Sequence, residues 1–121
     1  MNELLAGRRI LVVEDEVMIR VTMEDLLADL GCEMVAAAAT AEAAIAFLDV
    51  HVFDAALLDL NLDGVSSRVV AEMLAARGVP FVCATGNHGD MWEGFRNRPV
   101  LRKPFSHDGL VAILAGLLLA R

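Results

Sequence analysis

Cysteine and positive charge are both scarce in this sequence, and each shortage excludes a class of protein. The two cysteines, Cys32 and Cys83, lie in separate apolar runs, and two isolated cysteines make neither a disulfide framework nor a zinc site. We expect them to be buried thiols in a reducing compartment. Ten lysines and arginines stand against 17 aspartates and glutamates, for a net charge of -7. Nucleic-acid-binding proteins usually cluster positive charge on one face, so we expect no nucleic acid partner.

A membrane-spanning segment is also lacking. The segment that most suggests one, Leu110–Ala120, is shorter than the roughly 20 apolar residues that a spanning helix needs. The first residues, Met1–Leu5, lack the basic flank and long apolar stretch of a signal peptide. These observations predict a cytoplasmic protein without a membrane partner.

The sequence does contain enough apolar material for a folded core. Hydrophobic residues make up 57% and charged residues 22% of the 121 residues, which is unlike the composition of disordered proteins. A chain of this length fits one compact domain. We therefore expect residues 1–121 to form a single domain.

Short apolar runs alternate with segments of helical periodicity. The runs, which are too short for helices, predict strands at Arg9–Glu14, Glu33–Ala38, Asp54–Leu58, Pro80–Ala84 and Val100–Leu101. The helical segments are 16–30, from 40 onward, from 66 or 67 to 77, and from 106 or 107 onward. Segment 87–97 has weak periodicity and two glycines, which predicts a marginal, mobile helix. Five strands alternating with five helices favour an α/β fold with a doubly wound parallel sheet.

Residues typical of helix ends support these boundaries. Gly31 and Gly78 follow two of the helical segments, where a left-handed residue is favoured. Thr40 precedes the second helical segment and can cap it. Ser66 or Ser67 can cap the third, by the same side-chain chemistry.

Polar residues gather where the predicted strands end. In a doubly wound sheet, the carboxyl ends of the strands share one crevice. The residues just past these ends are Glu14, Asp15, Glu16, Asp59, Asn61, Thr85, Gly86, Lys103 and Pro104. The sequence therefore predicts that carboxylates, a hydroxyl and an ammonium group meet at one edge.

Three carboxylates in one crevice repel one another unless a cation offsets their charge. Glu14, Asp15 and Asp59 supply oxygen ligands with no histidine or cysteine among them, which favours Mg²⁺ over zinc. Lys103 is the only lysine in the chain, and its ammonium could pair with Asp59 and later with a phosphoryl oxygen. Thr85 offers a hydroxyl to another phosphoryl oxygen.

Four sequence blocks resemble the signature blocks of response-regulator receiver domains. They are Val-Val-Glu-Asp-Glu (12–16), Leu-Leu-Asp-Leu-Asn (57–61), Ala-Thr-Gly (84–86) and Arg-Lys-Pro-Phe (102–105). The resemblance spans nearly the whole chain and implies a (βα)5 fold with strand order 2-1-3-4-5. It implies that Asp59 is the phosphoacceptor, with Asp15 a direct Mg²⁺ ligand, Glu14 a ligand through water, and Asn61 a ligand through its carbonyl.

The same resemblance implies a function in a two-component phosphorelay. Thr85 and Lys103 would bind the phosphoryl group, and a cis Lys103–Pro104 bond would aim the ammonium inward. The donor would be a sensor histidine kinase or a phosphotransfer protein. The chain would promote its own phosphorylation and dephosphorylation without being an enzyme in the usual sense. It would signal by protein contacts, as a monomer or weak homodimer.

The sequence departs from the family pattern at its predicted fifth strand. Many receivers have an aromatic switch residue where this chain has Val100. The blocks around residues 81–86 and 98–105 are similar to short stand-alone alphaproteobacterial receivers. We hypothesise that such a chain signals by ordering segment 87–97. The departure also leaves open an alternative, a receiver-like interaction module that does not use phosphorylation.

Other chemistry is less favoured by the sequence. An aspartyl-phosphate hydrolase would have a second aspartate where Asn61 stands, and no nucleotide-binding glycine loop follows the first predicted strand. The three histidines, His51, His88 and His107, share no ligand spacing. We interpret Asp54 and Asp63 as ordinary loop or strand-end carboxylates. Burial and a partner patch both remain open for Trp92 and Phe95.

Overall fold

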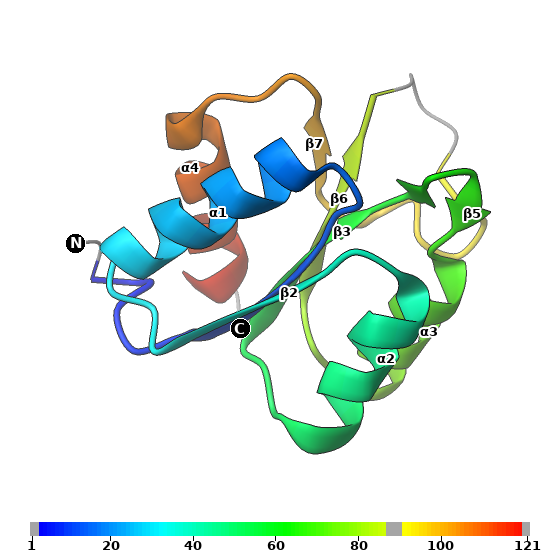
Figure 1. Cartoon of the computed structure of the whole chain (residues 1–121), viewed down its shortest axis with the longest axis horizontal. Helices are drawn as coiled ribbons and strands as arrows, with labels where there is room; N and C mark the ends of the chain where they lie inside the picture. The colour runs from blue at the N-terminus through cyan, green and yellow to red at the C-terminus, as the bar shows by residue number, and fades with distance from the viewer. Residues whose placement is uncertain (1–2, 87–90, 120–121) are drawn as a thin grey trace.

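Five parallel strands form the central sheet of the computed structural model, which describes residues 3–86 and 91–119. The strands are β1 (Arg9–Val13), β2 (Met34–Ala38), β3 (Ala55–Asp59), β6 (Phe81–Thr85) and β7 (Val100–Arg102). Their order is β2-β1-β3-β6-β7 (Figure 1). Since β6 and β7 are the fourth and fifth strands of this sheet, the predicted order 2-1-3-4-5 is confirmed.

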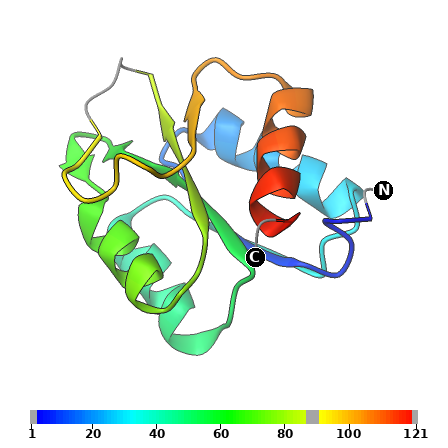
Figure 2. The ribbon, with the colours of Figure 1, turned by 180° about the vertical axis from the view of Figure 1, so that it is seen from behind.

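Helices cover both faces of the sheet, as in a doubly wound fold. Helices α1 (Val17–Asp29) and α4 (His107–Leu119) pack on one face, and α2 (Ala41–Val50) and α3 (Arg68–Ala76) on the other (Figures 1 and 2). All five residues of β3 are buried. This burial on both faces is why the strand is a continuous apolar run in the sequence.

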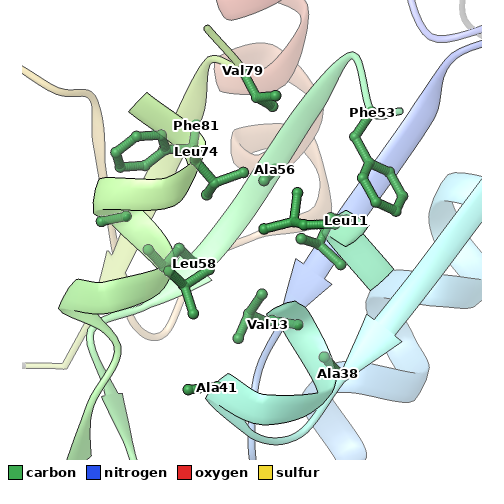
Figure 3. Close-up of a cluster of buried hydrophobic side chains, with 14 of the residues drawn as sticks. Leu11, Val13, Ala38, Ala41, Phe53, Ala56, Leu58, Leu74, Val79 and Phe81 are labelled. Carbon is green, nitrogen blue, oxygen red and sulfur yellow. The ribbon is translucent and has the colours of Figure 1, made fainter. Parts of the chain in front are cut away.

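Alternate residues of each strand feed two separate cores. In β1, Leu11 and Val13 face the α2–α3 side, whereas Ile10 and Val12 face the α1–α4 side. Figure 3 shows the first of these cores, where side chains of β1 and β3 meet Leu74 of α3. The sheet is thereby fixed against both helix layers, which in turn fixes the positions of the strand ends.

The predicted helix ends are largely confirmed. Thr40 Oγ1 accepts a hydrogen bond from Ala43 N at 3.1 Å, which caps α2. Ser106 Oγ accepts one from Gly109 N at 3.0 Å at the start of α4. Gly31 and Gly78 follow α1 and α3 with φ of 97° and 69°, the left-handed conformation that favours glycine.

One expected helix is absent from the part of the fold that the structure describes. The described residues form four helices, and residues 91–99 between β6 and β7 adopt turns. The predicted marginal helix over 87–97 is therefore wrong for its described part, and residues 87–90 lie outside the described residues. Phe95 is buried. Segment 91–99 is therefore held by the packing of individual side chains, not by the apolar face of a helix.

A small hairpin that the sequence did not predict follows β3. Strands β4 (Asn61–Leu62) and β5 (Val65–Ser66) pair antiparallel. The two residues between them, Asp63 and Gly64, have φ of 54° and 86°, which matches the Asp-Gly type I′ turn of tight hairpins. The turn expected at Asp63 and Gly64 is therefore confirmed. The hairpin that it closes lies at the carboxyl end of β3.

The cysteines are free thiols inside the fold. Cys83 is fully buried and Cys32 half-buried. Burial raises the pKa of the Cys83 thiol to about 11 and also raises the pKa of Cys32. No helix in residues 3–86 and 91–119 has the length and apolar character needed to cross a membrane.

Candidate functional site

The carboxyl ends of three strands bring a lysine against two carboxylates. Lys103, which follows β7, places Nζ 2.9 Å from Asp59 Oδ2 and 2.6 Å from Glu14 Oε1. Asp59 is the last residue of β3 and Glu14 directly follows β1. Residues 44 and 89 positions from Lys103 thus meet at one point because the parallel strands β1, β3 and β7 end at the same edge of the sheet.

Backbone contacts fix the direction of the lysine and of Asp59. The Lys103–Pro104 peptide bond is cis, as the resemblance implied, and Lys103 N donates to Thr85 O at 2.9 Å. Asn61 N donates to Asp59 Oδ1 at 3.2 Å. With Oδ2 paired to the ammonium, both oxygens of the Asp59 carboxylate are held.

Glu14 is the most deeply buried carboxylate of the site, with 1% of its surface exposed. Its Oε2 accepts a hydrogen bond from Glu16 N at 3.1 Å. Burial raises the pKa of Glu14 to about 7, although the ion pair with Lys103 opposes this shift. For Lys103, burial alone would lower the pKa, but the contacts with Glu14 and Asp59 outweigh it and the pKa is raised.

Arginine 20 holds the loop that carries the acidic pair. Arg20 Nη1, from α1, donates to the carbonyl oxygens of Glu14 and Asp15 at 2.9 and 3.2 Å. Arg20 was not among the residues predicted from the sequence. Its place in the first turn of α1, five residues after Asp15, is the signal that could have found it.

The donor set fits a divalent cation. Glu14, Asp15 and Asp59 each offer a carboxylate oxygen, and these atoms lie within 4.8 Å of one another. Glu14 Oε1 is buried and makes no hydrogen bond of normal geometry with the described residues, its close contact being the Lys103 ammonium. Oxygen-only donors suit Mg²⁺, which takes one or two carboxylates and keeps several waters. These residues would hold the ion.

An open cleft of about 350 Å³ lies over these carboxylates. We call it the acidic cleft; its lining comprises Asp15, Glu16, Asp59, Leu60, Asn61, Asp63, Gly64, Thr85, Gly86 and Lys103. Every predicted site residue except the buried Glu14 lines it, and Glu14 contacts it through Lys103. Asp63, which we interpreted as an ordinary loop residue, lines it too, because the hairpin folds over the end of β3.

The histidines do not join this site where they are described. His51 lies beside the rings of Phe47 and Phe53, and His107 begins α4. His88 lies outside the described residues. Within residues 3–86 and 91–119, the group able to hold a metal consists of the three carboxylates alone.

Trp92 and Phe95 are mainly packed against the fold. Phe95 is 8% exposed and Trp92 half-buried, with ring centroids 6.0 Å apart. Phe95 also lies 6.0 Å from the ring of Phe81 in β6. Val100, at the position of the family's switch aromatic, is 39% exposed. No ring occupies this position of β7.

This five-stranded parallel sheet, with helices on both faces and an acidic triad and a lysine at its carboxyl edge, defines a doubly wound α/β fold, and the chain belongs to the response regulator receiver domain family. The sequence model of that family matches residues 10–115. Receiver domains act in two-component signalling, generally interact with histidine kinases or phosphotransfer proteins, and are not classical enzymes.

Among solved structures, the chain is similar to SdrG of Sphingomonas melonis Fr1, with 46% identity, coverage of 92% of this chain and 96% of that one, and a TM-score of 0.80. It is also similar to the receiver domain of the Pseudomonas aeruginosa histidine kinase PA1611, solved with magnesium in its active-site cleft (27% identity, 93% and 98% coverage, TM-score 0.76).

A curated relative is the transcriptional regulatory protein PdtaR of Mycobacterium tuberculosis. It is 29% identical over 111 residues, which are 86% of this chain and 53% of PdtaR. The chain thus spans about half the length of the curated relatives it matches.

Proposed function

We propose that this receiver domain accepts a phosphoryl group on Asp59 in a Mg²⁺-dependent reaction, as part of a phosphorelay. The observation that carries the proposal is the 2.9 Å pair between Lys103 Nζ and Asp59 Oδ2 beside three converging carboxylates. A structural ion pair needs no open cleft above it, whereas this pair borders one. The similarity to SdrG and to the magnesium-bound PA1611 receiver supports the proposal.

The chemistry follows from how the residues hold charge. An Asp59 oxygen forms a bond to phosphorus as the bond from phosphorus to the donor's histidine nitrogen breaks, and that nitrogen takes a proton from solvent. Lys103 pairs with a phosphoryl oxygen, and the Thr85 hydroxyl donates to another. Asp15, Asp59, Glu14 and the backbone carbonyl of Asn61 would hold Mg²⁺, which would neutralise charge on the phosphoryl group. Catalysis of this kind is positioning plus electrostatics.

A second cavity supports a protein as the phosphoryl donor. The apolar groove, of about 510 Å³, runs between α1 and the start of α4 and includes Met18, Ile19, Met23 and Phe105 in its lining. It shares Glu16, Gly86 and Lys103 with the acidic cleft. A partner lying in this groove would therefore reach Asp59. We propose a sensor histidine kinase or phosphotransfer protein as that partner.

We also propose how the domain passes on its signal. Residues 1–121 act as a single receiver domain in the cytoplasm, monomeric or weakly dimeric, and signal by protein contacts. The domain promotes its own phosphorylation and dephosphorylation. The net charge of -7 supports the absence of a nucleic acid partner.

The proposal is tested by incubating the protein with Mg²⁺ and acetyl phosphate and measuring intact mass. We expect the mass to rise by one phosphoryl group in the wild type, and not in Asp59→Asn or when EDTA removes Mg²⁺. The matched control is Asp49→Asn, which changes an exposed carboxylate on α2 and should be phosphorylated like the wild type. Equal phosphorylation of Asp59→Asn and wild type would contradict the proposal.

The half-exposed Val100 favours one second candidate, an interaction module that works without phosphorylation. Such a module would bind its partner equally well with and without BeF₃⁻, which mimics an acyl phosphate. Amide chemical shifts of the wild type with Mg²⁺ and BeF₃⁻ separate the two functions. Shifts around Asp59 support phosphorylation, and an unchanged spectrum supports the module.

A further inference from the structure

The fold buries one polar side chain that the proposed chemistry does not use. Among the described residues, the buried polar or charged side chains are Glu14, Asp59 and Ser67. Ser67 is fully buried, and its Oγ donates a hydrogen bond of 2.5 Å to the carbonyl oxygen of Asp59. A buried hydroxyl therefore contacts the backbone of the phosphoacceptor itself.

Ser67 joins the two ends of the loop that borders the acidic cleft. Its backbone N donates to Leu60 O at 3.2 Å, next to the hydroxyl contact with Asp59. Between these two clasped ends lie the β4–β5 hairpin and the cleft residues Asn61, Asp63 and Gly64. The position of this whole loop relative to β3 thus depends on Ser67.

The loop in turn holds the Asp59 carboxylate. Asn61 N, at the start of the hairpin, donates to Asp59 Oδ1, and Asn61 Oδ1 accepts from Gly64 N at 2.6 Å. A displaced loop would move the amide that orients Asp59 and the Asn61 carbonyl proposed as a metal ligand. The hydroxyl of Ser67 thus bonds to the main chain of the same residue whose carboxylate is oriented by Asn61 N.

The usual role of a serine at this position does not account for the contact. Ser67 is the N-cap residue of α3, yet its side chain makes no capping hydrogen bond. The neighbouring Ser66 Oγ accepts from Arg68 N at 3.2 Å instead. The Ser67 hydroxyl thus does not cap α3 and instead points toward β3.

We propose that Ser67 is a positioning residue for the phosphoacceptor. It holds the Asp59 backbone and the 60–67 loop in the geometry that binds Mg²⁺ and the phosphoryl group. The inference rests on the proposed function for its phosphoryl part, whereas its effect on metal binding can be measured separately. Groups that orient metal ligands typically change metal affinity about 10- to 100-fold when they are removed.

The test compares Ser67→Ala with Ser66→Ala, its exposed neighbour and matched control. Mg²⁺ affinity is measured by calorimetry, and the rate of phosphorylation by acetyl phosphate from intact mass. We expect Ser67→Ala to weaken Mg²⁺ binding about 10-fold and Ser66→Ala to leave it within about twofold of the wild type. Ser67→Thr, which keeps the hydroxyl, should recover most of the affinity.

Two further readouts keep the outcome decisive. The amide resonance of Leu60 should shift in Ser67→Ala and stay unchanged in Ser66→Ala. If Ser67→Ala does not fold, Ser67→Cys, which replaces the hydroxyl by a slightly larger thiol and a weaker donor, is measured and should also bind Mg²⁺ more weakly. Wild-type Mg²⁺ affinity in the folded Ser67 variant overturns the inference. A wild type that binds Mg²⁺ but takes no phosphoryl group overturns the proposed function and leaves the test of Ser67 intact.

Discussion

The acidic cleft and segment 91–99 both lie beside β6 and β7, but different forces hold them together. In the cleft, Lys103 and two buried carboxylates meet at 2.6 and 2.9 Å. In segment 91–99, the ring of Phe95 packs at 6.0 Å from Phe81 and Trp92. Arg68 and Arg98 lie 5.7 and 6.0 Å from the centre of the same ring. Figure 2 shows this segment in yellow, running from the start of α3 to β7.

This difference explains why the sequence departs from the family pattern near segment 91–99 and at Val100 but keeps its charged residues around Asp59. Buried charges such as those of Glu14 and Asp59 depend on their partners, since removing one charge leaves the others without a partner. Packed rings tolerate exchange of one apolar side chain for another more readily. The charged residues of the receiver blocks are accordingly kept around Asp59, whereas the helix predicted over 87–97 is absent from its described part and Val100 stands where many receivers have an aromatic residue.

The largest expected effect comes from breaking the charge cluster. Lys103→Met keeps the apolar stem and removes the cation, so that Glu14 and Asp59 stay buried without it. We expect the free energy of unfolding at pH 8 to fall by about 3 kcal/mol or more, as measured by urea denaturation in EDTA. Added Mg²⁺ should restore part of the loss. Arg96→Met, at an exposed position of segment 91–99, is the control, and equal stability of the two variants would contradict the interdependence of the cleft charges.

The next effect is spread over a range of pH and concerns Glu14. The folded state raises the pKa of Glu14 from 4.5 to about 7, so it keeps a proton that the unfolded chain releases. Stability from this group is therefore complete below pH 4.5 and is lost as pH rises to about 7. The slope is at most about 1.4 kcal/mol per pH unit.

Glu14→Gln should flatten this slope in metal-free protein, because glutamine does not titrate. Urea denaturation in EDTA across that pH window measures it, with exposed Glu42→Gln as the control. Identical slopes for Glu14→Gln and the wild type would show that another group carries the pH dependence.

Residues whose role depends on where a strand ends could be predicted from the sequence. Glu14, Asp59 and Lys103 each follow or end an apolar run, and the doubly wound fold places such residues together. Ser67 could not be predicted, because a serine before a helix usually caps it, and only the hairpin of two-residue strands turns its hydroxyl toward β3. The turns of segment 91–99 could not be predicted either. The periodicity of its sequence is weak, and the contacts of Phe95 that fix these turns come from β6 and α3.

The smallest effect should come from the aromatic cluster and should stay confined to it. Phe95→Leu keeps an apolar side chain but loses the ring contacts with Phe81 and Trp92 and the cation–π contacts with Arg68 and Arg98. Aromatic pairs and cation–π contacts contribute about 0.5 to 1.5 kcal/mol each, so we expect a loss of about 2 kcal/mol. Thermal denaturation measures it, and the fluorescence of Trp92, the only tryptophan, should change.

Mg²⁺ affinity and phosphorylation of Phe95→Leu should equal those of the wild type, because no described contact joins the Phe95 ring to the cleft carboxylates. Phe47→Leu, a half-buried ring on α2, is the matched control for loss of an aromatic side chain elsewhere. A fall in Mg²⁺ affinity with Phe95→Leu but not with Phe47→Leu would show that the two regions are coupled. In that case the rings of segment 91–99 would connect Asp59 to the surface. Many receivers have an aromatic switch residue for this connection at the position where this chain has Val100.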